Sequence, residues 1–171
     1  MMDLKDKIRS IENYPQEGVI FRDITTLLKD AEGMKAAIDE MTAKLDGVEF
    51  DMVLGPESRG FIFGMPVAYN LGKGFVPVRK KGKLPAEVIS KEYALEYGTA
   101  TIEMHKDALQ PGQKVVIVDD LMATGGTAKA IIEMVEEMGA EVAALVFLIE
   151  LDFLEGRKVL PGYRIESVIH Y

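Results

Sequence analysis

Apolar residues along the chain follow two spacings, one typical of helices and one typical of buried strands. The helical spacing is clearest at Met34, Ala37, Ile38, Met41 and Leu45, and it predicts an amphipathic helix that ends at the next Asp-Gly pair. Similar spacing predicts helices over about 4–11, 61–71 and 130–138. Short uninterrupted apolar runs indicate buried strands at 52–54, 75–78, 114–118 and 142–149.

Apolar strands that alternate with helices predict an α/β fold, in which a central, mostly parallel sheet is flanked by helices on both faces. No repeat, low-complexity tract or Ser/Pro-rich linker divides the sequence, so residues 1–171 are expected to form a single domain. Ligands of such sheets bind at the carboxyl ends of the strands. Candidate functional residues are therefore sought in the turns that follow 52–54 and 114–118.

Composition narrows the classes of partner and compartment. A net charge of -8 argues against binding to a nucleic-acid backbone, which needs a basic surface. The absence of cysteine excludes disulfides, thiolate catalysis and cysteine-ligated metals. The polar start of the chain lacks a secretory signal, and the apolar run at 142–149 is far shorter than the roughly 20 residues of a membrane span. We therefore expect a cytoplasmic protein without a nucleic-acid or membrane partner.

The segment 115–127 carries the strongest chemical signal. Asp119 and Asp120 end a buried strand, where two adjacent carboxylates are costly unless they meet hydrogen-bond donors or a cation. The vicinal hydroxyls of a ribose are such donors. The turn that follows, made of Ala123, Thr124, Gly125, Gly126 and Thr127, opens a helix whose backbone N–H groups suit a phosphate monoester. The segment therefore predicts a site for a ribose 5-phosphate.

A plainer interpretation is that the acid pair caps the helix and that the two glycines only form a turn. The complete string after a strand favours the phosphate site. The string is neither a P-loop, because no Gly-Lys-Ser/Thr follows, nor a dinucleotide-binding G-x-G-x-x-G motif.

This string resembles the signature of the type I phosphoribosyltransferases. The resemblance implies a Rossmann-like core with a small hood, built from about 1–30 and 79–105, and a flexible loop. In that family the paired acids hold the ribose hydroxyls and the following turn holds the 5-phosphate. Those roles would fall on Asp119, Asp120 and the turn 123–127.

Two further segments resemble the diphosphate site of the same family. Glu57, Ser58 and Arg59 follow the strand at 52–54, and the resemblance implies a cis peptide bond near Glu57-Ser58, with Arg59 free to meet an anion. An ordinary turn with a surface arginine is the alternative. The basic cluster at 79–85 would add cations for the diphosphate from Arg79, Lys80 and Lys83, although by itself it is typical of a solvated loop.

The likeness to the adenine-using branch of this family extends over essentially the whole chain. It implies that Phe21 stacks on adenine, that Leu121 packs on the opposite face, and that backbone groups around Ile20 and Arg22 read the edge of the base. By itself, Phe21 would be expected in the core, as most phenylalanines are. It further implies transfer of a phosphoribosyl group from 5-phosphoribosyl-1-diphosphate to adenine, which gives AMP and diphosphate in purine salvage.

The resemblance assigns catalytic roles to Glu96, as the proton-handling acid at the purine, and to Arg59. Glu96 as a plain polar residue of the hood is the alternative. The expected cofactor is Mg²⁺, held through substrate and water without direct protein ligands, and the expected assembly is a homodimer. Two other functions stay open, namely transfer to another purine base and, as a non-enzymatic class, a regulator that senses phosphoribosyl diphosphate.

Overall fold

The structure, a computed structural model, describes residues 2–95 and 97–171, and these residues fall into two compact units. The first unit spans Met1–Glu40 and the second Met41–Tyr171. The helix α2 (Ala31–Ala43) crosses the boundary between them. It is the helix predicted from the spacing of Met34 to Leu45, and that prediction is confirmed.

The first unit contains a short antiparallel hairpin that the sequence did not predict. The helix expected over 4–11 is wrong beyond its first turn, because a 3-10 helix, η1 (Leu4–Lys7), ends there and a strand, β1 (Arg9–Glu12), follows. β1 pairs with β2 (Ile20–Asp23), and α1 (Thr25–Leu28) comes next. Arg9 lies opposite Asp23 in this pairing, and its guanidinium group donates to the Asp23 carboxylate. Pairing with a distant segment thus overrides the local apolar spacing.

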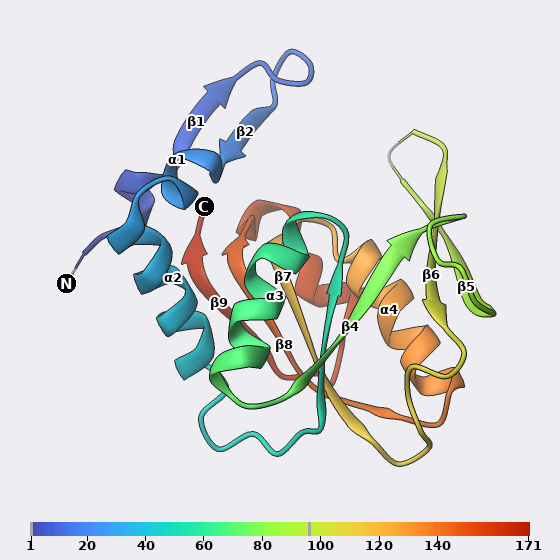
Figure 1. The fold of residues 1–171 in the computed structure, drawn as a ribbon. Coiled ribbons are helices and arrows are strands. Elements are labelled where there is room, and N and C mark those ends of the chain that lie inside the picture. Colours follow the sequence, from blue (N-terminus) through green and yellow to red (C-terminus); the bar gives the residue numbers. More distant parts are fainter. Residues whose placement is uncertain (1, 96) are drawn as a thin grey trace. The chain divides into compact units, whose positions relative to one another are not determined.

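The second unit is built on a seven-stranded sheet, counted over its described residues, in the order β5-β6-β4-β3-β7-β8-β9 (Figure 1). The strands are β3 (Met52–Pro56), β4 (Gly74–Lys80), β5 (Val88–Ala94), β6 (Thr99–His105), β7 (Lys114–Met122), β8 (Glu141–Glu150) and β9 (Ile165–His170). The five strands from β4 to β9 in this order are parallel, whereas β5 and β6 are antiparallel additions at one edge. The predicted α/β class is confirmed.

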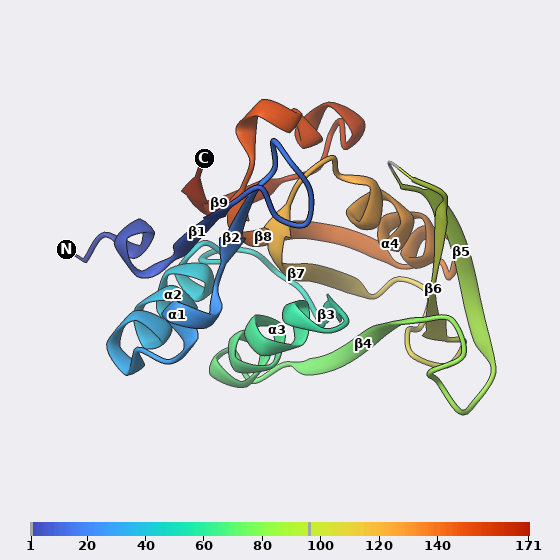
Figure 2. The ribbon, with the colours of Figure 1, turned by 90° about the horizontal axis from the view of Figure 1, so that it is seen from above.

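Two helices connect the parallel strands and determine where a ligand can bind. α3 (Arg59–Asn70) joins β3 to β4, and α4 (Gly126–Glu137) joins β7 to β8. These two connections leave the centre of the sheet in opposite directions, so right-handed crossovers put α3 and α4 on opposite faces, as Figure 2 shows. The order therefore reverses between β3 and β7, and a crevice opens at the carboxyl ends of those two strands.

The segment expected as a polar hood after the basic cluster has regular structure. β5 and β6 form an antiparallel hairpin, and β6 extends the sheet by pairing with the end of β4, where Arg79 lies opposite Glu103. The sequence did not predict β9 or the 3-10 helices η2 (Asp152–Leu154) and η3 (Gly156–Val159).

The core of the second unit contains the apolar runs that the sequence singled out. Leu54, Val115, Ile117, Leu145 and Phe147 are almost completely buried between the sheet and α4. Among the helices of residues 2–95 and 97–171, none is both long and apolar enough to cross a membrane.

Candidate functional site

A cavity of about 970 Å³ opens at the carboxyl ends of β3 and β7, where the order of the sheet reverses. Many of the residues that line it were candidate residues from the sequence: Glu57, Ser58, Arg59, Lys80, Asp119, Asp120, Leu121, Ala123, Thr124, Gly125, Gly126 and Thr127. Segments far apart in sequence thus meet at the edge of the sheet that the fold class predicts.

The turn between β7 and α4 has the backbone geometry of an anion site. Gly125 precedes α4 with a φ of 85°, a conformation that favours glycine, and Gly126 begins the helix. The turn packs backbone to backbone against η3: a Cβ on Gly125 would lie 2.7 Å from the Gly156 carbonyl oxygen, and one on Gly156 would lie 2.6 Å from the Ala123 carbonyl oxygen. The amino end of α4 lines the cavity, and the first N–H groups of a helix have no partner within the helix itself.

The acid pair lies beside this turn with unequal surroundings. Asp120 is buried and its carboxylate lies 2.7 Å from the Nε of Arg59, whereas the Asp119 carboxylate accepts a hydrogen bond from the backbone N–H of Asp120 at 2.8 Å. Loss of solvation, followed by the negative charge of Asp120, raises the pKa of Asp119 well above its usual value. The pair is thus short of positive charge and of hydrogen-bond donors, which a ribose hydroxyl or a cation would supply.

The loop after β3 has the predicted cis peptide bond between Glu57 and Ser58. Two contacts fix the loop to β4: the Glu57 N–H donates to the Val78 carbonyl at 2.8 Å, and the Glu57 carboxylate accepts from the Lys80 N–H. Gly60 lets α3 approach the acid pair, because a Cβ there would lie 2.9 Å from an Asp119 carboxylate oxygen and 2.7 Å from Pro56 Cδ.

Arg59 is not free in this structure, and the expectation that it meets an anion stays a prediction. Arg59 is the first residue of α3, and its guanidinium group pairs with Asp120 in the same cavity. Nothing in the sequence indicates this contact, since the two residues lie on different βα turns.

The three basic candidates from the cluster at 79–85 differ in position. Lys80 lines the cavity. The Nε of Arg79 lies 3.5 Å from the Glu57 carboxylate, and its Nη1 lies 3.5 Å from the Lys83 carbonyl oxygen. The buried Glu103 carboxylate accepts from the Gly82 N–H at 3.0 Å and so holds the turn that carries the cluster. Arg79 and Lys83 are outside the described lining of the cavity.

The four adenine candidates lie in both units. Leu121, on β7, lines the cavity. Ile20, Phe21 and Arg22 lie on β2 in the first unit, where Ile20 is exposed and Phe21 is partly buried. The Phe21 ring packs edge-on against Tyr14 with centroids 5.2 Å apart. Phe21 is therefore not a fully buried core residue, which was the alternative to a role in binding.

Glu96, the proposed proton-handling residue, lies outside the described residues. Tyr93, on β5, lines the cavity and was not predicted as a site residue from the sequence. The hydroxyl groups of Tyr93 and Thr127 are hydrogen-bonded at 3.2 Å. The signal that could have found it is the alternation of Ile89 and Tyr93 with polar Ser90 and Glu92 in the sequence, which is typical of a half-buried strand.

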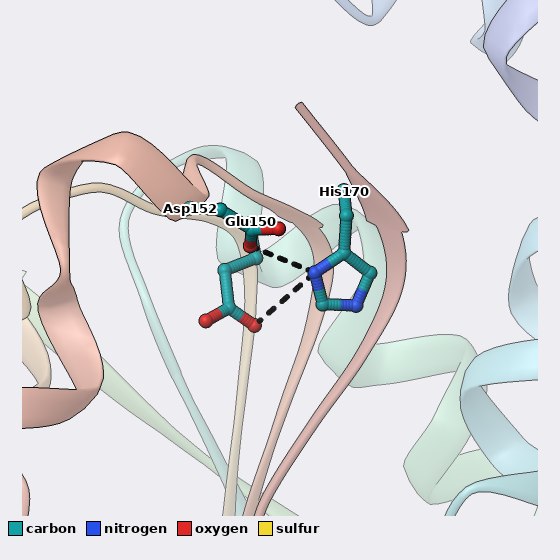
Figure 3. Close-up of side chains that lie close together, drawn as sticks. All are labelled: Glu150, Asp152 and His170. Atoms are coloured by element: carbon teal, nitrogen blue, oxygen red, sulfur yellow. Dashed lines mark hydrogen bonds and ion pairs between the residues drawn. The ribbon is translucent and has the colours of Figure 1, made fainter.

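A second cluster of ionisable side chains lies at the carboxyl ends of β8 and β9 (Figure 3). Glu150, Asp152 and His170 have ligand atoms within 4.8 Å of one another, and His170 Nδ1 lies 2.8 Å from Asp152. The Glu150 carboxylate accepts hydrogen bonds from Nε and Nη2 of Arg157 at 2.7 and 2.8 Å. It also accepts one from the Ser167 hydroxyl at 2.6 Å. These partners lower the pKa of Glu150, with Arg157 as the largest cause. The cluster is therefore an ion-pair network between the ends of β8 and β9.

Comparisons with known proteins agree with this geometry. The family described as phosphoribosyl transferase domain matches residues 25–163. The adenine phosphoribosyltransferase of Lachnoclostridium phytofermentans is 60% identical over 171 residues, which are 100% of this chain and 98% of the relative. The crystal structure of the adenine phosphoribosyltransferase from Thermoanaerobacter pseudethanolicus superposes with a TM-score of 0.96 at 54% identity and covers 98% of each chain. The Saccharomyces cerevisiae enzyme, complexed with an imino-altritol bisphosphate and adenine, gives 0.90 at 40% identity and covers 96% of each.

Proposed function

This chain belongs to the phosphoribosyltransferase family, among its adenine phosphoribosyltransferases, and on that premise we propose how its residues make AMP. The reaction transfers the 5-phosphoribosyl group from 5-phosphoribosyl-1-diphosphate to adenine and releases diphosphate, a step of purine salvage. The observation that carries the proposal is that one cavity contains the acid pair, the glycine turn and the loop with the cis peptide bond.

The ribose 5-phosphate end of the donor is assigned to the turn and the acid pair. The N–H groups of residues 123–127 and the hydroxyls of Thr124 and Thr127 would bind the phosphate at the amino end of α4. Asp119 and Asp120 would accept hydrogen bonds from the two ribose hydroxyls. The pKa of Asp119 is raised because its ionised form is buried beside a second carboxylate. Hydrogen bonds from the ribose hydroxyls would stabilise that form, which supports this assignment.

The diphosphate is assigned to Glu57, Ser58 and Arg59 of the loop, and to Arg79, Lys80 and Lys83. Their positive charges would stabilise the negative charge that develops on the leaving group. Arg59 would have to exchange Asp120 for the diphosphate as the donor enters, because the ion pair lies inside the same cavity. The bond to diphosphate loosens first and adenine then attacks, so positioning and charge contribute most of the acceleration.

Magnesium fits the chemistry of this cavity, since it usually keeps several of its waters, and the carboxylates of Asp119 and Asp120 can accept hydrogen bonds from such waters. Bound with the diphosphate, Mg²⁺ would neutralise charge on the leaving group. In this proposal the acid pair meets the ion through ribose hydroxyls and water, without direct ligation.

Adenine is assigned to Ile20, Phe21, Arg22 and Leu121. The partial burial of Phe21 and the position of Leu121 in the cavity support this assignment. Glu96 would handle the proton that leaves the purine. The hood, from about 1–30 and 79–105, would exclude water from the reacting carbon within a single functional domain.

The proposal includes a cytoplasmic homodimer. Sedimentation of the purified protein tests the assembly, with twice the mass of 18.9 kDa as the expected result. A monomer that remains fully active would contradict it.

The test of the reaction is nucleotide formation from phosphoribosyl diphosphate, magnesium and one purine base at a time. AMP from adenine, with little product from hypoxanthine or guanine, is the expected result. Asp120→Asn should lower turnover by roughly a hundredfold or more, because the acid pair would lose its contact with the ribose. Asp152→Asn, the same change at an exposed aspartate outside the cavity, is the matched control. Binding without turnover of any base would instead favour a regulator.

A further inference from the structure

The strand β5 of the β5–β6 hairpin contacts α4 through two polar contacts among the described residues. The Tyr93 hydroxyl lies 3.2 Å from Thr127 Oγ1. Lys91 forms an ion pair at 2.8 Å with Glu133, which lies more than one turn further along the helix. The Tyr93 ring lies over the first turn of α4, since a Cβ on Gly126 would be 3.6 Å from its Cδ2. One of the two contacts therefore lies within the turn to which the 5-phosphate is assigned.

The direction of the hydrogen bond between Tyr93 and Thr127 has to depend on what Thr127 binds. A threonine hydroxyl has one hydrogen to donate and two lone pairs, and its hydrogen rotates to suit its partners. A phosphate dianion offers acceptors only, so Thr127 has to donate to it. The phenolic hydroxyl of Tyr93 can donate as well as accept, so it is then the donor to Thr127.

From this geometry we propose that Tyr93 is a positioning residue for the 5-phosphate, acting through Thr127. By donating to Thr127 Oγ1, the Tyr93 hydroxyl directs the threonine hydrogen toward the phosphate and strengthens that hydrogen bond through polarisation. Tyr93 also links occupation of the phosphate site to the strand β5. The inference rests on the proposed function, because it requires the phosphate to bind at 123–127.

The test measures the affinity for ribose 5-phosphate, which probes the phosphate site without turnover. Tyr93→Phe keeps the ring and removes only the hydroxyl. It should weaken binding roughly fivefold to tenfold, the range expected for one hydrogen bond. In turnover the variant should raise the KM for phosphoribosyl diphosphate by a similar factor, with the KM for adenine unchanged.

A double-mutant cycle with Thr127 separates positioning from a general structural effect. In a Thr127→Ala background, Tyr93→Phe should have no further effect, because the group through which it acts is gone. In a Thr127→Ser background, which keeps the hydroxyl, the effect should return. Full additivity of Tyr93→Phe and Thr127→Ala would overturn the proposal, and so would unchanged affinity in Tyr93→Phe.

Two matched controls use other polar contacts of α4. The Tyr163 hydroxyl donates to Glu136 near the far end of the helix, so Tyr163→Phe removes a comparable bond outside the cavity and should leave the affinity unchanged. Lys91→Met removes the other contact of the hairpin. Equal weakening by Lys91→Met and Tyr93→Phe would attribute the effect to docking of the hairpin and overturn the positioning role. If Thr127→Ala itself leaves binding unchanged, the assignment of the phosphate in the proposed function fails, which is a different result from failure of Tyr93 alone.

Discussion

The guanidinium group of Arg59 and the carboxylate of Asp120 form an ion pair, with Nε 2.7 Å from Oδ2, across the two βα turns of the cavity. About half of the Arg59 side chain is exposed, whereas the Asp120 side chain is 9% exposed. The arginine can therefore leave toward solvent or toward a ligand, but the aspartate stays in place. This inequality makes the pair a contact that a ligand is able to replace.

Arg59→Met should weaken the binding of diphosphate much more than the binding of ribose 5-phosphate. Loss of a charged hydrogen bond is expected to weaken diphosphate binding by roughly 10- to 100-fold. Binding of ribose 5-phosphate should weaken much less, since the substitution also frees Asp120 from a competing partner. Titration calorimetry with each ligand measures both effects. Arg164→Met, at an arginine paired with Glu166 outside the cavity, is the control. An equal loss for both ligands would mean that Arg59 acts only by supporting Asp120.

Gly60→Ala should damage the acid pair without removing any of its groups. Its new Cβ would meet Asp119 and Pro56 at 2.9 and 2.7 Å, distances that force a shift in the site. Overpacking of this kind costs about 1–3 kcal/mol of stability. Gly64→Ala is a matched control on the same helix, because its Cβ would meet Phe75 Cε2 at 2.6 Å instead. Thermal unfolding should show a loss in both variants, but only Gly60→Ala should lose affinity for ribose 5-phosphate.

Binding at the acid pair should release a proton at a pH above the range in which an ordinary aspartate titrates. Burial, followed by the charge of Asp120, raises the pKa of Asp119. In the free protein its carboxyl group therefore keeps its proton to a higher pH than an ordinary aspartate does. Hydrogen bonds from ribose hydroxyls favour the ionised form, and the proton leaves on binding. The affinity for ribose 5-phosphate should therefore rise with pH above the range in which an ordinary aspartate titrates, and level off once Asp119 is ionised in the free protein. Calorimetry in buffers of different ionisation enthalpy measures the release, which Asp119→Asn should abolish. Equal release in that variant would assign the proton to another group.

Asp23 should make the protein sensitive to acid. Its pKa is lowered from 3.8 to about 2, first by the hydroxyl of Thr25 and then by Arg9 on the opposite strand. Because the folded-state pKa is depressed, the stabilisation is complete above the unfolded value of 3.8 and is lost as the pH falls toward 2. Across that range, the midpoint temperature of thermal unfolding should depend less steeply on pH for Asp23→Asn than for the unmodified protein. Asp39→Asn, the same change at an exposed aspartate of α2, is the matched control.

The sequence predicted those parts of the molecule in which local chemistry and the apolar pattern agree. The segment 114–127 is the best example, because a buried strand, two acids and a glycine turn follow one another directly. The sequence missed features that depend on pairing between distant segments. Residues 9–12 form a strand because Arg9 and its neighbours pair with β2, and the ion pair of Arg59 with Asp120 requires two separate turns to meet.

Gly125 packs closely against Gly156, so the shape of the phosphate turn depends on contact between two backbone segments. Side chains around the turn can therefore change with little effect on its path, whereas a single methyl group at either glycine would force the two segments apart. In a saturation screen for growth on adenine as purine source, Gly156 should be as intolerant of substitution as the acids of the cavity. The tolerance of a position in such a screen would then report the distance between backbones as well as contact with substrate.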